Sequence, residues 1–249
     1  MGRILLILLN IYFYVLFLLA HVIVIPLLLL FVFLLSFFVS KRTVMKRFRR
    51  CISWYGIVMT SVPFPFIRIK YEDHSGESSD GSYIFVCNHR STSDAYLMCV
   101  LPHEVVQVVN IWPFRIPVLG RFARLAEYLD IRNMTPEDFN DKAAALLDEG
   151  ISIIFFPEGT RSGKSETGPF HSSAFRLALN SKAPIVPLCI SGTENAPQKG
   201  SFLLHPGMIR VRRLPAIVWE EYKDFSVFSL KNRVREIIDK ELSLMECKT

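Results

Sequence analysis

One long stretch without charge constrains this chain more than any other feature. Residues 4–39 are 36 positions with no charged residue and no glycine. A hydrocarbon core about 30 Å thick needs about 20 apolar residues, whereas this stretch would reach about 54 Å as one straight helix. We therefore predict a membrane anchor. Pro26, just after His21, favours two helical pieces in a hairpin or re-entrant arrangement, and one long tilted helix is the alternative.

The polar side chains inside this stretch are few. They are Asn10, Tyr12, Tyr14, His21 and Ser36. The apolar run greatly exceeds the h-region of a signal peptide and lacks a convincing small-residue cleavage site, which argues against a cleaved signal sequence.

The net charge of +6 is carried by the first 50 residues. They hold Arg3 and six basic residues between Lys41 and Arg50, with no acid, while the remaining chain has 22 basic and 23 acidic residues. Basic residues beside an apolar segment are typical of a flank that faces anionic headgroups on the cytoplasmic side, or of a stop-transfer signal. We predict a membrane location, the inner membrane in a bacterium, with the remaining chain on the cytoplasmic face. No nucleic-acid partner is expected, because the excess charge lies outside the folded domain.

Two regions follow from these patterns: an anchor with its basic flank at residues 1–50, and a folded domain at residues 51–249. In the second region short apolar runs alternate with helical patterns, which predicts an α/β fold. Expected strands lie at 82–86, 151–156, 184–190 and 208–214, the last more exposed, and residues 71–81 read as a polar loop. Expected helices start near Ser91, Thr135 and His171, and an amphipathic helix covers 226–247. Residues 51–65 suggest either an interfacial helix leading into a strand or a buried core helix.

Two polar motifs each follow a buried strand. "NHRSTSD" places His89 five positions before Asp94, and "FFPEGTRS" contains Glu158, Gly159, Thr160 and Arg161. Ser91 and Asp94 alone would fit a helix capping box, and the second motif alone would fit a surface turn. Ligand sites of α/β proteins gather at the carboxyl ends of strands, so two such turns predict one shared polar site.

These residues resemble the glycerolipid acyltransferases, and most of all the 1-acylglycerol-3-phosphate acyltransferase group. His89 and Asp94 match the first signature and "FPEGTRS" the third, about 64 residues later. Residues 116–132 resemble the second, with Arg132 at its arginine position, and residues 183–190 the fourth. One departure is the lysine expected before Ile116–Pro117: Asn110 or Ile111 stands there, and Arg115 is the residue that compensates.

The resemblance implies a mixed sheet flanked by helices and an acyl transfer without a metal or other cofactor. The donor is acyl-CoA or acyl carrier protein, the acceptor a lysophospholipid in the bilayer, and the product phosphatidic acid. His89 is the expected general base, because neutral imidazole accepts protons at neutral pH, and Asp94 orients it. Arg161 and Arg132 are expected to bind phosphate, with Glu158, Gly159 and Thr160 in the substrate site.

Other interpretations predict different chemistry. Cys87 could be a nucleophile, but its apolar flanks raise a thiol pKa. His89, Asp94, Glu158 and His171 could bind a metal, but their spacing is not that of a zinc site. The five cysteines are odd in number and form no C-x-x-C pair, so no disulfide framework is expected. Acylation of another lysolipid, such as a lyso-aminolipid, and an inactive lipid-binding module remain as alternatives.

Overall fold

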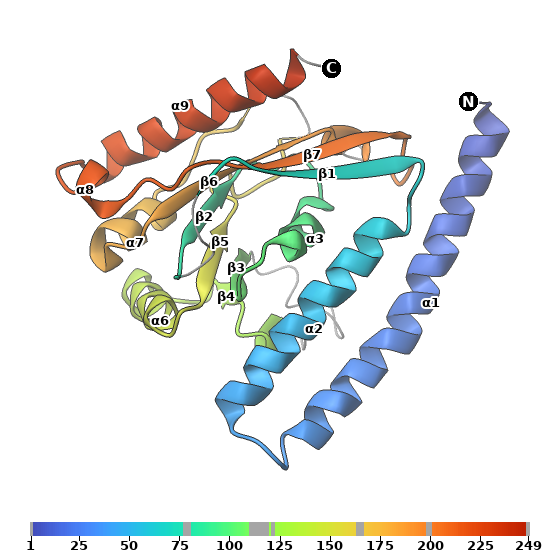
Figure 1. The fold of residues 1–249 in the computed structure, drawn as a ribbon, viewed down its shortest axis with the longest axis horizontal. Helices are drawn as coiled ribbons and strands as arrows, with labels where there is room; N and C mark the ends of the chain where they lie inside the picture. Colours follow the sequence, from blue (N-terminus) through green and yellow to red (C-terminus); the bar gives the residue numbers. More distant parts are fainter. Residues whose placement is uncertain are drawn as a thin grey trace.

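The computed structural model describes residues 2–76, 81–109, 120, 123–162, 167–197 and 201–247. It shows a seven-stranded sheet with helices on both faces and two long N-terminal helices along one side (Figure 1). The helical elements are α1 Arg3–Leu35, α2 Lys41–Ser61, α3 Asp94–Leu97, η1 Met98–Val100, α6 Pro136–Asp148, α7 Ser173–Ser181, η2 Thr193–Asn195, α8 Trp219–Tyr222 and α9 Val227–Glu246. The strands are β1 Ile67–Asp73, β2 Ile84–Cys87, β3 Val105–Val109, β4 Leu129–Asp130, β5 Ser152–Phe155, β6 Ile185–Ser191 and β7 Gly207–Arg213.

The sheet has the strand order β1-β7-β6-β2-β5-β3-β4 and is mixed, as expected. Strands β6, β2, β5, β3 and β4 run parallel, β7 is antiparallel to β6, and β1 pairs in parallel with β7. Every residue of β2, β5 and β6 is buried, because helices cover both faces of these central strands. The carboxyl ends of the parallel strands therefore meet at one edge of the sheet.

The helix at residues 136–148 confirms its prediction in detail. Thr135 precedes it and its hydroxyl oxygen accepts the backbone N–H of Asp138 at 3.1 Å, while Pro136 occupies the first turn. This cap satisfies one of the unpaired N–H groups at the helix start. Gly150, with φ +80°, follows the helix and lets the chain turn directly into β5.

Two expectations about the edge of the sheet are wrong. Residues 71–73 belong to strand β1 rather than to a loop, and the second half of β7 is buried rather than exposed. The alternating pattern of β7 misled because Arg212 is buried yet paired: its guanidinium contacts Glu72 of β1 and Glu241 of α9. Buried charges are tolerated when they are paired in this way.

The preferred anchor geometry, two helical pieces, is also wrong, and the structure has the single long helix of the alternative, whose tilt in a bilayer stays a prediction. Residues Arg3–Leu35 form one continuous helix with Pro26 inside it, and the chain turns at residues 36–40 into α2. Among the described residues α1 is the one helix long and apolar enough to cross a membrane. Proline is tolerated inside apolar helices of this kind when the surroundings satisfy the freed backbone carbonyl.

Helix α2 extends across position 50, where the two expected regions meet, and has two different faces. One face is buried against the sheet domain and includes Phe48 and Arg49, and the other exposes Trp54 and Ile57. The buried face agrees with the expected core helix, and the interfacial placement of the exposed face stays a prediction. Arg49 donates to the carbonyl oxygen of Ala126 at 3.1 Å and pairs with Glu104 at 2.7 Å, so α2 is tied to the domain by a buried cation.

Close packing of α2 on η1 requires a glycine. A Cβ at Gly56 would collide with Sγ and Cβ of Cys99. We expect Gly56→Ala to destabilise the protein by about 1–3 kcal/mol, as overpacking does, measured as thermal unfolding in detergent. Gly207→Ala is the control, since a Cβ there meets no atom within 4 Å. Combining Gly56→Ala with Cys99→Gly removes both colliding atoms, so the double variant should be more stable than the sum of the two single effects predicts. Strict additivity of the two changes in unfolding free energy would contradict the contact.

Candidate active site

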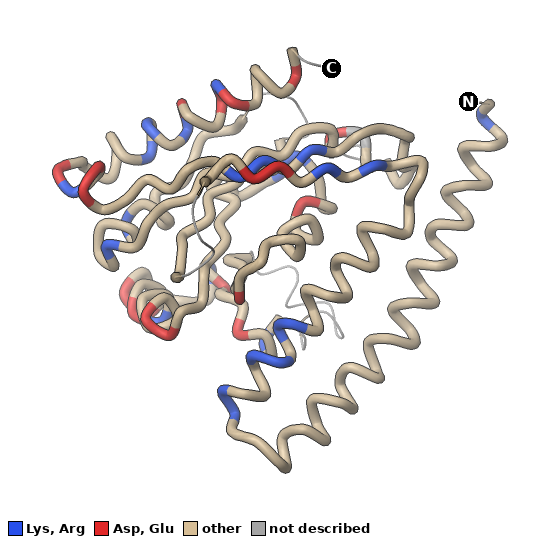
Figure 2. Tube along the Cα trace, viewed as in Figure 1, with Lys and Arg blue, Asp and Glu red and all other residues tan. Residues whose placement is uncertain are grey.

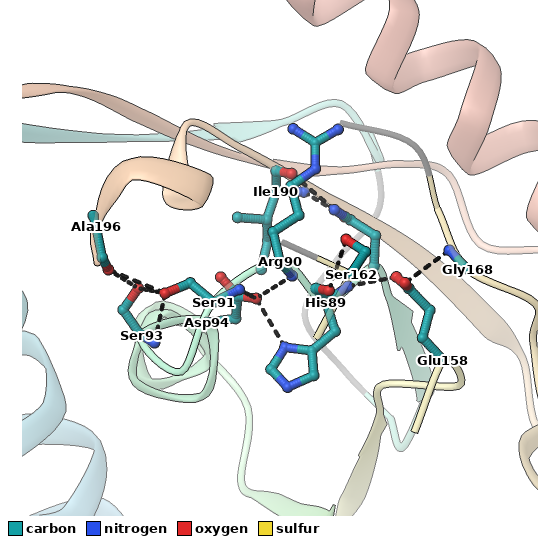
Figure 3. Close-up of polar contacts among 11 residues, drawn as sticks. His89, Arg90, Ser91, Ser93, Asp94, Glu158, Ser162, Gly168, Ile190 and Ala196 are labelled. Carbon is teal, nitrogen blue, oxygen red and sulfur yellow. Dashed lines mark hydrogen bonds and ion pairs between the residues drawn. The ribbon is translucent and has the colours of Figure 1, made fainter. Parts of the chain in front are cut away.

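The turn after β2 is fixed by neighbouring strands through its backbone (Figure 3). The His89 N–H donates to Oε1 of Glu158 at 2.7 Å, and its carbonyl oxygen accepts the N–H of Ser162 at 2.9 Å. Asn88 exchanges two hydrogen bonds with the backbone of Ile190 on β6, at 2.9 and 2.8 Å. The histidine therefore projects from a turn bonded on both sides.

His89 and Asp94 form a hydrogen-bonded pair. Nδ1 of His89 lies 2.8 Å from Oδ2 of Asp94, whose side chain is fully buried. A carboxylate only accepts, so Nδ1 carries the proton and Nε2 of the neutral ring is an acceptor. The second ring nitrogen points away from Asp94 (Figure 3), and the side chain keeps 18% of its surface exposed. The ring of Phe156 packs against the imidazole with centroids 4.5 Å apart.

The capping interpretation of Asp94 is partly right. Its Oδ2 also accepts the backbone N–H groups of Arg90 at 2.7 Å and Ser91 at 2.8 Å. The reciprocal half of a capping box is missing, because the Asp94 N–H donates to the carbonyl oxygen of Ser91 at 3.3 Å rather than to its hydroxyl. One carboxylate oxygen thus shapes the turn and orients the imidazole.

Glu158 lies behind the site. Its Oε1 holds the backbone of His89, and its Oε2 accepts the N–H of Gly168 at 2.8 Å. Burial raises the pKa of this carboxyl, and the two backbone N–H groups oppose that rise. The structure places Glu158 among backbone groups rather than on the wall of the neighbouring cavity.

A cavity of about 930 Å³ opens beside His89. It is lined by the expected residues Gly159, Thr160, Arg161 and Arg132, the last just beyond β4, and its apolar wall includes Val108, Phe139 and Phe155. Six residues were expected to share a site with His89. Four of them line this cavity, and the other two, Asp94 and Glu158, do not. A site of this size and mixed lining is typical of small-ligand pockets.

Arginines give the cavity its charge. Within the part of the chain that the structure describes, the guanidinium groups of Arg132, Arg161 and Arg176 make no ion pair. Arg176, on α7, is absent from the expected site because its helix reads as an ordinary amphipathic one. Unpaired guanidinium groups at a cavity wall favour a ligand that carries phosphate or carboxylate.

His171 is a second residue that the motifs did not assign to this cavity. It lines the cavity, its N–H donates to the carbonyl oxygen of Pro157 at 2.7 Å, and its ring covers Gly159. Gly159 has φ +68°, and a Cβ there would lie 3.0 Å from the His171 ring. The glycine is therefore required by both its backbone conformation and the close histidine.

The rival chemistries find little support in this geometry. Cys87 is fully buried, and burial raises the pKa of its thiol well above the ordinary value, so the thiolate needed for attack is disfavoured. The described residues contain no group of three or more His, Cys, Asp or Glu side chains that could hold a metal ion. Asn110, Ile111 and Arg115, where the second signature departs from its pattern, lie outside the described residues.

Comparisons with known proteins agree with the fold and the motifs. A family model described as Acyltransferase matches residues 68–191. The chain is 29% identical over 213 residues to a 1-acyl-sn-glycerol-3-phosphate acyltransferase of Limnanthes alba, covering 76% of this chain and 75% of that protein. It is 30% identical over 200 residues to the enzyme of that name from Cocos nucifera, covering 69% and 65%. The match to the Escherichia coli enzyme of that name is 26% over 188 residues, covering 72% and 75%.

A solved structure has the same fold. It is the 1-acyl-sn-glycerophosphate acyltransferase PlsC from Thermotoga maritima, with a TM-score of 0.80 over 99% of this chain and 98% of that chain, at 22% identity. The family model covers both polar motifs, and the fold match includes the N-terminal helices. The chain belongs to the acyltransferase family.

Proposed function

We propose that this protein transfers an acyl chain from an acyl thioester to the free hydroxyl of 1-acylglycerol-3-phosphate and so forms phosphatidic acid. The observation that carries the proposal is the His89 imidazole, oriented by Asp94, at the wall of a cavity that also holds three arginines without an ion pair to any described residue. Its relatives named 1-acyl-sn-glycerol-3-phosphate acyltransferases support the choice of acceptor. Acyl-CoA and acyl carrier protein present the same thioester, and both fit this chemistry.

The reaction follows from the hydrogen bonds of His89. Nε2 takes the proton of the acceptor hydroxyl while the oxygen attacks the thioester carbonyl. Asp94 stabilises the resulting imidazolium through Nδ1, as the acid of a catalytic triad does. The tetrahedral intermediate then expels the thiolate, which takes the proton back from Nε2. The acceptor oxygen replaces the nucleophile of a hydrolase, so no acyl-enzyme is needed.

Arg161 and Arg132 bind the acceptor phosphate in this proposal, and Arg176 adds a third cation. Bidentate guanidinium contacts fix both the position and the orientation of a phosphate. A cavity with three cations also compensates for the lysine that the second signature lacks. Gly159 and Thr160 line the same wall and bring the backbone close to the bound ligand.

The membrane placement rests on α1 and on four basic residues of α2. Lys41, Lys46, Arg47 and Arg50 are exposed, whereas Arg42 and Arg49 pair with acids of the sheet domain. Figure 2 shows the basic residues gathered on the lower part of α2, beside a helix α1 that is uncharged beyond Arg3. We infer that these four face anionic headgroups on the cytoplasmic side. Residues 1–50 then act as the anchor with its flank, and residues 51–249 as the catalytic domain.

Loss of the base is the first test. His89→Ala should lower kcat by about 10²–10⁴-fold, the range for a general base, with acyl transfer measured by thiol release in the presence of a lysophosphatidate. His74→Ala, an exposed histidine on the loop after β1, is the matched control. Asp94→Asn should also lower kcat, calculated per folded molecule. Near-normal turnover in folded His89→Ala protein would falsify the mechanism.

The carboxylate behind the site gives a second prediction. Glu158→Gln leaves one acceptor for two backbone donors, so we expect kcat to fall while the acceptor KM changes little. Burial raises the pKa of Glu158 above its ordinary value of 4.5, so ionisation of this group disfavours the folded state. The stability of the native protein relative to Glu158→Gln should therefore decrease as pH rises from 4.5 toward 7, measured by unfolding in detergent. An increase over that interval would contradict the assigned shift.

The acceptor headgroup gives a third prediction. Arg161→Ala should raise the acceptor KM by about 10- to 100-fold, the worth of a charge-assisted hydrogen bond, and leave the donor KM nearly unchanged. Arg161→Lys should restore only part of the loss, since an ammonium group lacks the fork geometry. Arg68→Ala, an exposed arginine of β1 away from the cavity, is the control.

The same assay decides between acceptor classes. A monoacylglycerol without phosphate should be a poor substrate and should respond little to Arg161→Ala. The absent second-signature lysine is the observation that favours a different lysolipid, such as a lyso-aminolipid. Preference for an acceptor without phosphate would overturn the lysophosphatidate assignment and leave the role of His89 intact.

A further inference from the structure

Helix α1 carries a buried asparagine in an otherwise exposed apolar surface. Asn10 is 6% exposed, while its neighbours Leu8 and Ile11 are more than half exposed. Its side-chain oxygen accepts the N–H of Leu204 at 2.8 Å, and its side-chain nitrogen donates to the carbonyl oxygen of the same residue at 3.0 Å. One amide side chain thus satisfies both polar backbone groups of a residue 194 positions away.

A tyrosine one turn along α1 bonds to the same segment. The Tyr14 hydroxyl donates to the carbonyl oxygen of Phe202. Residues 201–206 have no regular secondary structure, so their backbone groups are not paired within a helix or strand. Two side chains of the apolar helix therefore provide three hydrogen bonds to this irregular segment.

Apolar side chains of this segment face outward, whereas its polar side chains, Ser201 and His205, are partly buried. Phe202 is 82% exposed and Leu203 is 39% exposed, and residues 201–206 contain no charged residue. Residues 62–66 lie beside them, joined by the bond from the Gly207 N–H to the Phe66 carbonyl oxygen at 2.9 Å, and Phe64 there is 68% exposed. We call residues 62–66 and 201–206 together the apolar rim.

The chemistry of the rim identifies what it contacts. Exposed aromatic side chains on two adjacent segments mark an interaction surface rather than an ordinary aqueous one. Irregular backbone is tolerated in hydrocarbon only when its polar groups are satisfied by the protein. If this segment lay in water, solvent would satisfy the backbone groups of Phe202 and Leu204. An asparagine on the apolar helix would then bring no benefit. The rim is also continuous with α1, which bears no charge beyond Arg3 (Figure 2).

We propose that the apolar rim of the catalytic domain enters the lipid bilayer together with α1, and that Asn10 and Tyr14 are the side chains that make this possible. This inference rests on the membrane placement proposed above. The anchor is then a composite of α1 and a loop surface more than 190 residues away in sequence. The rim residues would lie about 5–10 Å into the headgroup and acyl boundary, the depth of interfacial apolar side chains.

A tryptophan reporter tests the insertion. Trp54, Trp112 and Trp219 are replaced by Phe in the full chain, and the Phe202→Trp variant is then bound to phosphatidylcholine–phosphatidylglycerol vesicles that contain lipids brominated near the top of the acyl chains. Phe228→Trp is the matched control, because Phe228 is 66% exposed on α9 and far from α1. We expect a blue-shifted emission and strong quenching for the Phe202→Trp variant, and neither for the Phe228→Trp variant.

Each other result overturns the proposal. Red-shifted, unquenched emission from the Phe202→Trp variant would place the rim in water. Blue-shifted but unquenched emission would place it against protein, as in contact with a second copy of the chain. Acyl transfer is measured on the same samples, so active protein with an unquenched reporter would reject the rim insertion and leave the proposed reaction standing.

The role of the two polar side chains is tested in the background of the Phe202→Trp variant. Asn10→Ala and Tyr14→Phe should each reduce the quenching of this reporter and make residues 201–206 more sensitive to protease on vesicles. Tyr12→Phe is the control, since no described partner bonds to the exposed Tyr12 hydroxyl. Tyr14→Phe preserves the helix, so it keeps the test valid if Asn10→Ala fails to fold. Unchanged quenching in both variants would contradict the proposed role of Asn10 and Tyr14.

Discussion

A single buried carboxylate oxygen organises the catalytic edge of this protein. Oδ2 of Asp94 accepts N–H groups from the His89 ring, from Arg90 and from Ser91, all within 2.8 Å. A fully buried carboxylate is costly unless it is hydrogen-bonded, so the turn that supplies these donors is also what permits the charge. The same contact sets the histidine tautomer, so folding of the turn also fixes the ring orientation that the proposed mechanism requires. The helix-cap and catalytic interpretations of this motif therefore describe one set of hydrogen bonds.

The charges at this edge are divided by sign. The acids Asp94 and Glu158 are directed at backbone N–H groups and at an imidazole, whereas Arg132, Arg161 and Arg176 are left for the cavity. The carboxylates thus hold the loops without neutralising the guanidinium groups. A cavity lined in this way has a positive potential at its wall, which favours an anionic headgroup. Parallel strands make the arrangement possible, because β2, β4 and β5 all end at the same edge.

Local patterns predicted the elements and motifs that depend on neighbouring residues. The His89–Asp94 pair could be anticipated only with the resemblance to the acyltransferase signatures, because the motif alone favoured a helix cap, whereas Thr135 marked its helix directly. Arg176 and His171 could not, because only the packing of α7 against the loop at Gly159 brings them to the cavity. The continuity of α1 through Pro26 was missed because proline, which usually ends a helix in water, is tolerated inside long apolar helices. The buried β7 was missed because its arginines find acids on β1 and α9, which are distant in sequence.

The N-terminal helices and the catalytic pair are connected by direct packing. Helix α2 packs on η1 at Gly56, where no side chain fits, and Phe17 of α1 meets the ring of Tyr96 on α3 at 6.3 Å between centroids. Helix α3 begins at Asp94, so the residue that bonds to the His89 ring starts the element on which both long helices rest. A flexible linker between anchor and domain would let the site drift relative to the bilayer. In the proposed membrane-bound state, rigid contact instead fixes His89 at one height relative to the lipid surface, which suits an acceptor whose acyl chain remains in the membrane.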